Sequence, residues 1–393
     1  MKAERHWLRQ FLAVFFITAA GIAILEVVAT LLFPSPRAFF IWPPALEETF
    51  HPDQALLPGT SPRAWFRTNS AGLRAYEPAP NDDYRILVLG GSAAECLYLN
   101  QRETWPRRLH SLLQAALPGF RVWIGNGGRS GQSSRDHIFH LEYLPLRRLD
   151  IDAVVILLGA NDLLLRLRQD SAYDPECLQE PAAVERQIDH AFLMVPASYS
   201  LPPPPLYRRT GLWRALKRLR NRFYRPEPQD PRGEVIRNWR LLRRQAGELR
   251  PTLPSLESAF REYTANVERM IRYASRKGFR LIFVTQPALW KRNPSSREMD
   301  ALWMGGVGEF KRLPGQAYYA PGALAAGLEA YNALLMDYCR RRGVECLDLA
   351  AGYPRDLEHF YDDCHFTLAG AEETARRLAE YLLSRPPWGP ARR

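Results

Sequence analysis

The stretch Arg85 to Cys96 reads Arg-Ile-Leu-Val-Leu-Gly-Gly-Ser-Ala-Ala-Glu-Cys and decides the fold. A short apolar run followed by two glycines is typical of a buried parallel strand that ends in a tight turn. This pattern puts Ser92 at the carboxyl end of the strand, the edge where open α/β sheets bind ligands. Gly90 and Gly91 lack a Cβ atom, so the backbone can turn sharply and a substrate can approach the serine. Taken alone, the stretch is more simply explained by a serine that caps a helix.

Three later stretches supply the partners that a catalytic serine needs. Residues 126–131 read Asn-Gly-Gly-Arg-Ser-Gly and residues 159–162 read Gly-Ala-Asn-Asp, and each stretch follows a predicted strand. Residues 361–367 read Tyr-Asp-Asp-Cys-His-Phe-Thr, which places a carboxylate three residues before a histidine, in a turn that precedes a predicted helix. With Ser92, these stretches offer a nucleophile, a base with an orienting acid, and donors for an oxyanion.

The order and spacing of these four blocks resemble the SGNH hydrolases, also called the GDSL esterase and lipase superfamily, whose name lists the Ser, Gly, Asn and His of the blocks. The resemblance implies an α/β fold, a three-layer α/β/α sandwich whose five-stranded parallel sheet has a flavodoxin-like strand order. Gly91 departs from the family, which usually has Asp at this position. Because that Asp does not carry the proton, its absence bears on substrate class and local rigidity more than on the nucleophile.

The chemistry gives each member of a Ser-His-Asp triad a role. A serine hydroxyl is a poor nucleophile near neutral pH and needs an adjacent base. His365 is the candidate base because imidazole titrates near the working pH and can later protonate the leaving alcohol. Asp362 can accept the other ring proton and stabilise the imidazolium, although Asp363 competes for this role. The resemblance favours Asp362.

The resemblance also implies three donors to the oxyanion of the tetrahedral intermediate. They are the backbone N–H of Ser92, the backbone N–H of Gly131 and the side-chain amide of Asn161. Each has a simpler explanation on its own, Gly131 as a turn glycine and Asn161 as a loop-capping residue. Their occurrence in order, each after a predicted strand, favours the oxyanion role.

Three further residues are candidates for substrate binding. Gln286 ends another predicted strand at the same sheet edge, and Trp290 lies in the long loop that follows. Residues 68–74, Thr-Asn-Ser-Ala-Gly-Leu-Arg, resemble a segment that precedes the first block in many membrane-anchored members of this family. Arg74 could reach the rim of the active site from there, while a structural ion pair explains it equally well.

Strand and helix patterns alternate from residue 85 onward, which predicts parallel strands joined by right-handed crossovers. The expected strands span residues 85–90, 121–125, 153–158, 279–285 and 344–349. The expected helices span about 102–116, 134–148, 256–277, 324–342 and 368–384. We therefore expect a hydrolase domain over 85–385 with an insertion at about 164–254, a preceding stalk and N-terminal extension over 36–84, and a disordered tail over 386–393.

The N-terminus predicts a cytoplasmic end and a transmembrane anchor within residues 1–35. Residues 11–33 form a nearly unbroken apolar segment, which as a helix extends about 34 Å and can cross a hydrocarbon core of about 30 Å. A signal peptide has a shorter apolar region, and no clear small-x-small cleavage site follows. Lys2, Arg5 and Arg9 precede the segment, so we expect a single-pass protein of the inner (cytoplasmic) membrane with a periplasmic or extracellular catalytic domain.

Two charged features bear on how the chain meets a membrane. Glu26 is the only charge within the apolar segment. A carboxylate there is a functional candidate by default, but near the outer end it can reach the interface or pair with a partner helix. Residues 208–225 hold eight basic residues and no acid, with apolar residues at helical spacing, so they predict a basic amphipathic helix on an anionic membrane surface. A solvated helix packed on the domain and a collar that attracts an anionic glycan are the alternatives.

Composition excludes several other classes of protein. The formal net charge of +11 favours an anionic neighbour, but we find no zinc-finger spacing, RNA-binding signature or helix-turn-helix pattern, so nucleic acid is not an expected partner. The five cysteines are scattered and odd in number, and the histidines lack clustered partners. We therefore expect no disulfide framework, no metal site and no cofactor.

Together these features predict a membrane-anchored SGNH-type serine esterase, a carboxylic ester hydrolase. It would cleave O-acyl esters, above all O-acetyl esters, of a cell-envelope glycan or a small ester through an acyl-serine intermediate. Relatives of this layout also serve as O-acetyltransferases, and the choice between water and a sugar hydroxyl depends on site shape and water exclusion. A non-catalytic glycan-binding or envelope-assembly protein is a further alternative, against which the intact triad residues argue. A lipase is disfavoured because no long apolar lid is evident.

Overall fold

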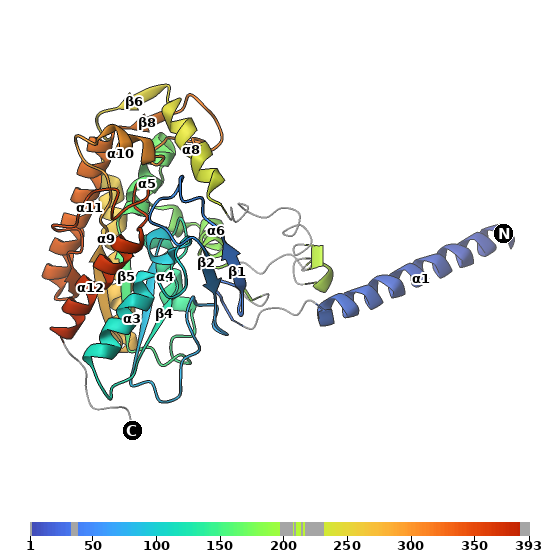
Figure 1. Cartoon of the computed structure of the whole chain (residues 1–393). Helices are drawn as coiled ribbons and strands as arrows, with labels where there is room; N and C mark the ends of the chain where they lie inside the picture. The colour runs from blue at the N-terminus through green and yellow to red at the C-terminus, as the bar shows by residue number, and fades with distance from the viewer. Residues whose placement is uncertain are drawn as a thin grey trace. The chain divides into compact units, whose positions relative to one another are not determined.

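The computed structural model describes residues 2–32, 38–196, 207, 210–213, 215–216 and 232–385. The chain divides into two compact units (Figure 1). The first comprises Met1–Phe39 and Met194–Gln229, and the second comprises Phe40–Leu193 and Asp230–Arg393. Most of the predicted basic helix at 208–225 lies outside the described residues, as does the predicted tail at 386–393.

A five-stranded parallel sheet forms the centre of the second unit. Its strand order is β4-β3-β5-β7-β9, so the first strand lies between the second and the third, as in flavodoxin-like sheets. Every residue of β3, β4 and β5 is buried, which explains their nearly continuous apolar sequences. The strands are β3 (Tyr84–Gly90), β4 (Val122–Asn126), β5 (Ala153–Leu158), β7 (Arg280–Thr285) and β9 (Glu345–Leu347). The predicted fold class is confirmed.

Helices cover both faces of the sheet, as right-handed crossovers require. On one face α3 (Trp105–Ala116) packs against α12 (Leu368–Leu383). On the other face α9 (Glu257–Lys277) contacts both α4 (Ser134–Tyr143) and α11 (Pro321–Arg342). The helix α4 ends before its predicted limit of 148 because Leu144 precedes Pro145, and a residue before proline disfavours the helical conformation.

The segment predicted as a stalk belongs to the second unit from Phe40 onward. It forms an antiparallel pair of short strands, β1 (Glu47–Phe50) and β2 (Ala64–Arg67). The indole of Trp42 donates to the carbonyl oxygen of Gly128 (3.1 Å). The backbone N–H of Arg74 donates to the carbonyl oxygen of Asn126 (2.8 Å). These bonds join the extension to the loop that carries the second sequence block.

Much of the predicted insertion is also part of this unit. After β5 the chain continues through α5 (Ala160–Gln169), two short 3-10 helices (Asp170–Ala172 and Cys177–Gln179) and α6 (Pro181–Ala191). It re-enters through α8 (Glu234–Arg244) and β6 (Glu248–Arg250), and β6 pairs in parallel with β8 (Ala317–Tyr319). The elements α8, β6 and β8 lie together with α10 (Ser296–Ala301) at one end of the unit, at the top of Figure 1.

The first unit contains the N-terminal helix α1 (Lys2–Leu32). Its stretch Arg9–Leu32 has a mean hydropathy of 2.5 and is long and apolar enough to cross a membrane. By length and composition it is either a single membrane anchor or a signal sequence.

Candidate active site

Ser92, His365 and Asp362 form a continuous hydrogen-bonded chain at the carboxyl edge of the sheet. Ser92 begins the short helix α2 (Ser92–Glu95) directly after β3, and its hydroxyl lies 2.6 Å from Nε2 of His365. The other ring nitrogen, Nδ1, lies 2.8 Å from Oδ1 and 2.7 Å from Oδ2 of Asp362. In this arrangement the serine hydroxyl can donate to a neutral imidazole whose Nδ1–H donates to the carboxylate.

The electrostatics of the pair suit a general base. Burial acts to raise the pKa of Asp362, but the facing His365 and its hydrogen bond outweigh burial and hold that pKa below its ordinary value. Burial likewise acts to lower the pKa of His365, whereas the charge of Asp362 raises it above its ordinary value. A buried, ionised carboxylate therefore stabilises the imidazolium that forms when the serine gives up its proton.

The neighbouring carboxylate, Asp363, has a different set of partners. Its Oδ2 accepts from the backbone N–H groups of Trp303 (2.7 Å) and Met304 (3.1 Å), and its Oδ1 accepts from the indole of Trp290 (2.7 Å). Burial raises the pKa of Asp363, and the adjacent Asp362 adds to this effect. Of the two competing aspartates, it is Asp362 that faces the histidine, while Asp363 connects three loops.

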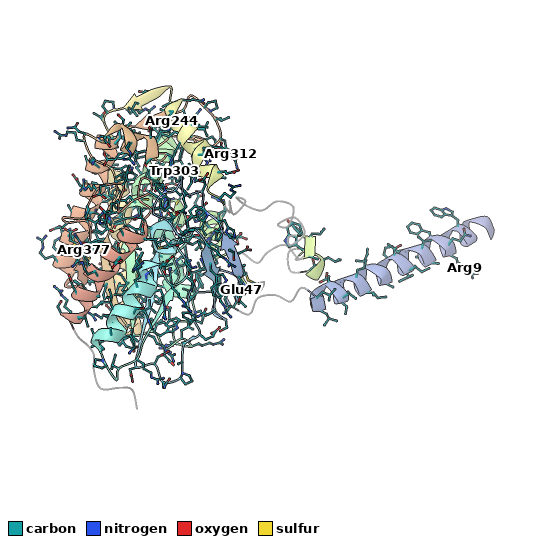
Figure 2. All side chains as sticks on the ribbon, in the orientation of Figure 1. Arg9, Glu47, Arg244, Trp303, Arg312 and Arg377 are labelled. Carbon is teal, nitrogen blue, oxygen red and sulfur yellow. The ribbon has the colours of Figure 1, made fainter. Side chains whose placement is uncertain are left out.

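Trp303 is a site residue that the sequence did not reveal. Its indole Nε1 donates to Oδ2 of Asp362 at 2.9 Å. Its ring is nearly parallel to the imidazole of His365, at 17° with centroids 6.4 Å apart, and the ring of Tyr361 is also inclined by 17° to that imidazole. The side chain is 5 % exposed and lies at the same end of the unit as α8 (Figure 2). It therefore holds both the carboxylate and the ring plane of the base.

Two arginines of α8 lie behind this pair of aspartates. Arg240 donates from Nη2 to the carbonyl oxygen of Tyr361 at 2.8 Å. Its positive charge faces both Asp362 and Asp363, and that of Arg243 faces Asp363. Burying two adjacent carboxylates is costly unless nearby charges compensate them. A helix of the insertion therefore contributes directly to the electrostatics of the site.

The three predicted oxyanion donors lie just after the first three strands of the sheet, Ser92 at the start of α2, Gly131 in a turn and Asn161 at the start of α5. No acceptor within the described residues takes the backbone N–H of Ser92 or that of Gly131, and Gly131 has a φ of +79°. The side-chain amide of Asn161 donates one hydrogen to the carbonyl oxygen of Gln132 at 2.7 Å, which leaves its second hydrogen for another acceptor.

Asp162 fixes the first turn of α5, which carries Asn161. Oδ1 of Asp162 accepts from the backbone N–H (3.1 Å) and the hydroxyl (2.5 Å) of Ser134, and the amide of Asn266 donates to that hydroxyl (2.9 Å). Burial raises the pKa of Asp162 to about 7. This network connects the start of α5 to α4 and α9 and so fixes the backbone that carries Asn161.

Comparison with known proteins identifies the family. The model of the GDSL-like lipase and acylhydrolase family matches residues 88–373, a stretch that includes the whole hydrogen-bonded chain described above. The chain belongs to the GDSL-like acylhydrolases. No protein in the curated set matches the chain.

Solved structures resemble this acylhydrolase at low sequence identity. An acetylxylan esterase from Geobacillus stearothermophilus is 14 % identical, with 76 % of this chain and 94 % of that one covered and a TM-score of 0.40. An α/β hydrolase from the metagenome of Lake Arreo in Spain is 15 % identical, with the same coverage and the same TM-score.

A neighbouring side chain fills the space at Gly91, the position where the family usually has Asp. Gly91 has φ −80° and ψ −152°, a conformation open to any residue, so its backbone does not require glycine. However, a Cβ atom at this position would lie 2.1 Å from Nδ2 of Asn161. The amide of Asn161 occupies the space that a side chain at position 91 would need.

Arg74 is buried beside the turn that follows Ser92 and does not lie at an open rim. Its guanidinium donates to the carbonyl oxygens of Glu95 (2.6 Å), Cys96 (2.8 Å) and Leu99 (2.6 Å). The side chain is 4 % exposed, and burial lowers its pKa to about 10. Cys96 has a φ of +54°, which is unusual for a residue with a side chain. Arg74 thus stabilises the turn that follows Ser92.

Gln286 and Trp290 do not join the hydrogen-bonded chain of Ser92, His365 and Asp362. They line a small cavity against α11, and none of Ser92, Asp362 and His365 takes part in its lining. The backbone N–H and carbonyl of Gln286 both bond to the side chain of Asn332. Trp290 is 1 % exposed, and its indole donates to Asp363. Trp290 therefore supports the segment around Asp363 from within the core.

The described residues contain no group of three or more His, Cys, Asp or Glu side chains that could hold a metal ion. The five cysteines are free, and three of them are buried. Burial raises the pKa of the Cys364 thiol well above its ordinary value, so this neighbour of His365 is not poised to form a thiolate.

Proposed function

We propose that this acylhydrolase is a membrane-anchored serine esterase that removes short O-acyl groups, above all acetyl, from a glycan of the cell envelope. The observation that carries the proposal is the chain from the Ser92 hydroxyl through His365 to Asp362, with heavy-atom distances of 2.6 Å and 2.7 Å. These distances lie within the range over which a general base can accept the proton of a nucleophile.

In the proposed reaction, Oγ of Ser92 attacks the acyl carbonyl carbon while Nε2 of His365 takes the hydroxyl proton. Asp362 accepts the Nδ1–H bond throughout and stabilises the imidazolium. The negative oxygen of the tetrahedral intermediate faces the N–H groups of Ser92 and Gly131 and the amide of Asn161. The sugar alcohol leaves with the proton from His365, and water then attacks the acyl-serine by the same route in reverse.

The proposed location follows from the N-terminal helix. Lys2, Arg5 and Arg9 precede the apolar span, and a cluster of basic residues before a span favours a cytoplasmic N-terminus. The catalytic unit then lies on the opposite side of the membrane, where acylated envelope glycans are found. The esters that it meets there would be those of polymers close to the membrane surface.

The test uses the full chain in detergent, with acetylated oligosaccharide as substrate and Ser92→Ala as the matched variant. Release of free acetate by the wild type and its loss in the variant support the esterase. Acetate that moves to an added sugar, with little free acetate released, would indicate a transferase. If neither product forms and small esters also resist hydrolysis, the proposal is wrong.

A further inference from the structure

The outer end of α1 packs closely against a turn of the insertion within the first unit. In this turn the helical residue Gly211 lies so close to α1 that an added Cβ atom would be 2.4 Å from the backbone nitrogen of Thr30 and 2.7 Å from the carbonyl carbon of Ala29. Ala29 is only 6 % exposed, whereas Leu25 and Leu31 beside it are 57 % and 75 % exposed. Backbone atoms of a helix cannot move aside, so only glycine fits at this contact.

The single charge of the apolar segment supplies the polar part of the contact. The carboxylate of Glu26 accepts the backbone N–H of Gly211 on Oε1 and that of Leu212 on Oε2, the latter at 3.0 Å. The hydroxyl of Thr30 also donates to Oε1, at 3.0 Å. A carboxylate placed within an apolar helix is costly unless it is hydrogen-bonded, and these donors satisfy it.

The turn is also closed by its own hydrogen bonds. The hydroxyl of Thr210 donates to the carbonyl oxygen of Tyr207 (2.6 Å) and accepts from the backbone N–H of Trp213 (3.1 Å). The rings of Tyr207 and Trp213 pack edge to face with centroids 5.1 Å apart. Tyr207 is 52 % exposed and Leu216 is 58 % exposed, so apolar surface remains open on this turn.

The position along α1 at which Glu26 bonds to the turn indicates what covers the exposed apolar surface of Tyr207 and Leu216. Glu26 lies six residues before the end of α1 at Leu32, which is about 9 Å along the helix axis. Amphipathic segments at a membrane surface lie about 5–10 Å into the boundary between headgroups and acyl chains, where tyrosine and tryptophan are enriched. Tyr207 and Leu216 are exposed, as are the apolar side chains Leu25 and Leu31 of α1, and those of α1 require lipid around them if the helix spans a bilayer.

We propose that the turn around Gly211, comprising Tyr207, Thr210–Trp213 and Ala215–Leu216, docks on α1 through Glu26 and lies in the lipid interface of the non-cytoplasmic leaflet. The chain then contacts the bilayer at two places, the span itself and this turn. The proposal rests on the anchor role proposed above for α1. It gives Glu26 the function of holding the insertion at the membrane.

The experiment measures the depth of a nitroxide label at position 216 in the full chain. The protein carries Leu216→Cys in a background of Cys177→Ser and Cys346→Ser, which removes the two half-exposed native thiols, and is reconstituted in phosphatidylcholine vesicles with and without phosphatidylglycerol. Collision with oxygen reports lipid, and collision with a water-soluble nickel complex reports water. A label at Leu313, which is 52 % exposed in the catalytic unit, gives the value for water.

The proposal predicts high oxygen and low nickel accessibility at position 216. Gly211→Ala should shift the label toward the Leu313 value, because the added methyl group cannot fit against α1. Gly21→Ala is the matched control, since a Cβ atom there meets nothing within 4 Å, and it should leave the label where it is. Dependence on phosphatidylglycerol would show that headgroup charge adds to the apolar contact, and equal depth in both vesicles would show that the apolar contact suffices.

Three results would overturn the proposal. One is nickel accessibility at position 216 equal to that at position 313, which would place the turn in water. Another is low accessibility to both reagents, which would indicate a second copy of the chain as the covering partner. The last is a depth unchanged by Gly211→Ala. The intact mass of the purified chain distinguishes these three results from a failure of the anchor role, because a chain whose N-terminal segment was cleaved as a signal sequence would have a lower mass. Acetate release tests the proposed esterase function independently.

Discussion

Replacing Gly91 by alanine should disable the oxyanion donor at Asn161 while leaving the fold intact. The new Cβ atom would lie 2.1 Å from Nδ2 of Asn161, and carbon and nitrogen atoms in contact need well over 3 Å, so the amide must move by about 1 Å or more. The amide is the end of a flexible side chain, so the displacement costs little stability. One oxyanion donor is worth about 3–4 kcal/mol, which corresponds to a loss of about 100-fold to 1,000-fold in kcat.

A double-mutant cycle tests this mechanism. Gly91→Ala and Asn161→Ala should each lower kcat for p-nitrophenyl acetate by about 100-fold or more. The double variant should be no slower than Asn161→Ala, because the methyl group has no amide left to displace. Melting temperatures should change by only a few degrees. If Gly91→Ala keeps full activity, or if the two losses multiply, the steric argument is wrong.

Two further predictions concern the base and its support. In the wild type the acidic limb of the kcat/KM profile should lie above pH 6.5, because the charge of Asp362 raises the pKa of His365. Asp362→Asn removes that charge and leaves burial, which lowers the pKa of His365, so the limb should move to lower pH. The same variant should lower kcat by about 10,000-fold. A limb that does not move would contradict the assigned pair. Trp303→Phe keeps a ring beside His365 but removes the 2.9 Å hydrogen bond to Asp362, so kcat should fall about tenfold with an unchanged KM. A change in KM alone would indicate that Trp303 contacts the substrate instead.

Most of the sheet could be predicted from the sequence because its strands are buried on both faces. The predicted 85–90, 153–158 and 279–285 agree with β3, β5 and β7 to within a residue at each end. The extension over 36–84 could not be assigned in this way. Its strands β1 and β2 have four residues each and lie among prolines, so no periodic pattern develops.

The residues of the hydrogen-bonded chain Ser92-His365-Asp362 and the side chains that support them differ in how strongly local sequence marks them. Asp362 and His365 are three residues apart, and Ser92 follows a strand, so local sequence signals mark all three. Trp303 donates to an aspartate 59 residues away, and Arg240 to a carbonyl 121 residues away. Contacts of that range depend on how loops pack, and no local pattern encodes them.

Arg74 and Trp290, both proposed from the sequence as substrate-binding residues, show how little the residue type says about exposure. Both are buried, and they bond to the segments that follow Ser92 and precede His365. Long polar-tipped side chains can bury their bodies and still satisfy their polar ends, and the sequence does not distinguish this from exposure at a rim.

Covalent labelling tests most directly whether Ser92 is an activated nucleophile. The full chain is treated with a fluorophosphonate, and the modified peptide is located by mass spectrometry. We predict one adduct, on Ser92, that is absent in Ser92→Ala and forms at least 100-fold more slowly in His365→Ala. An unlabelled wild type, or a wild-type labelling rate in the histidine variant, would contradict the account.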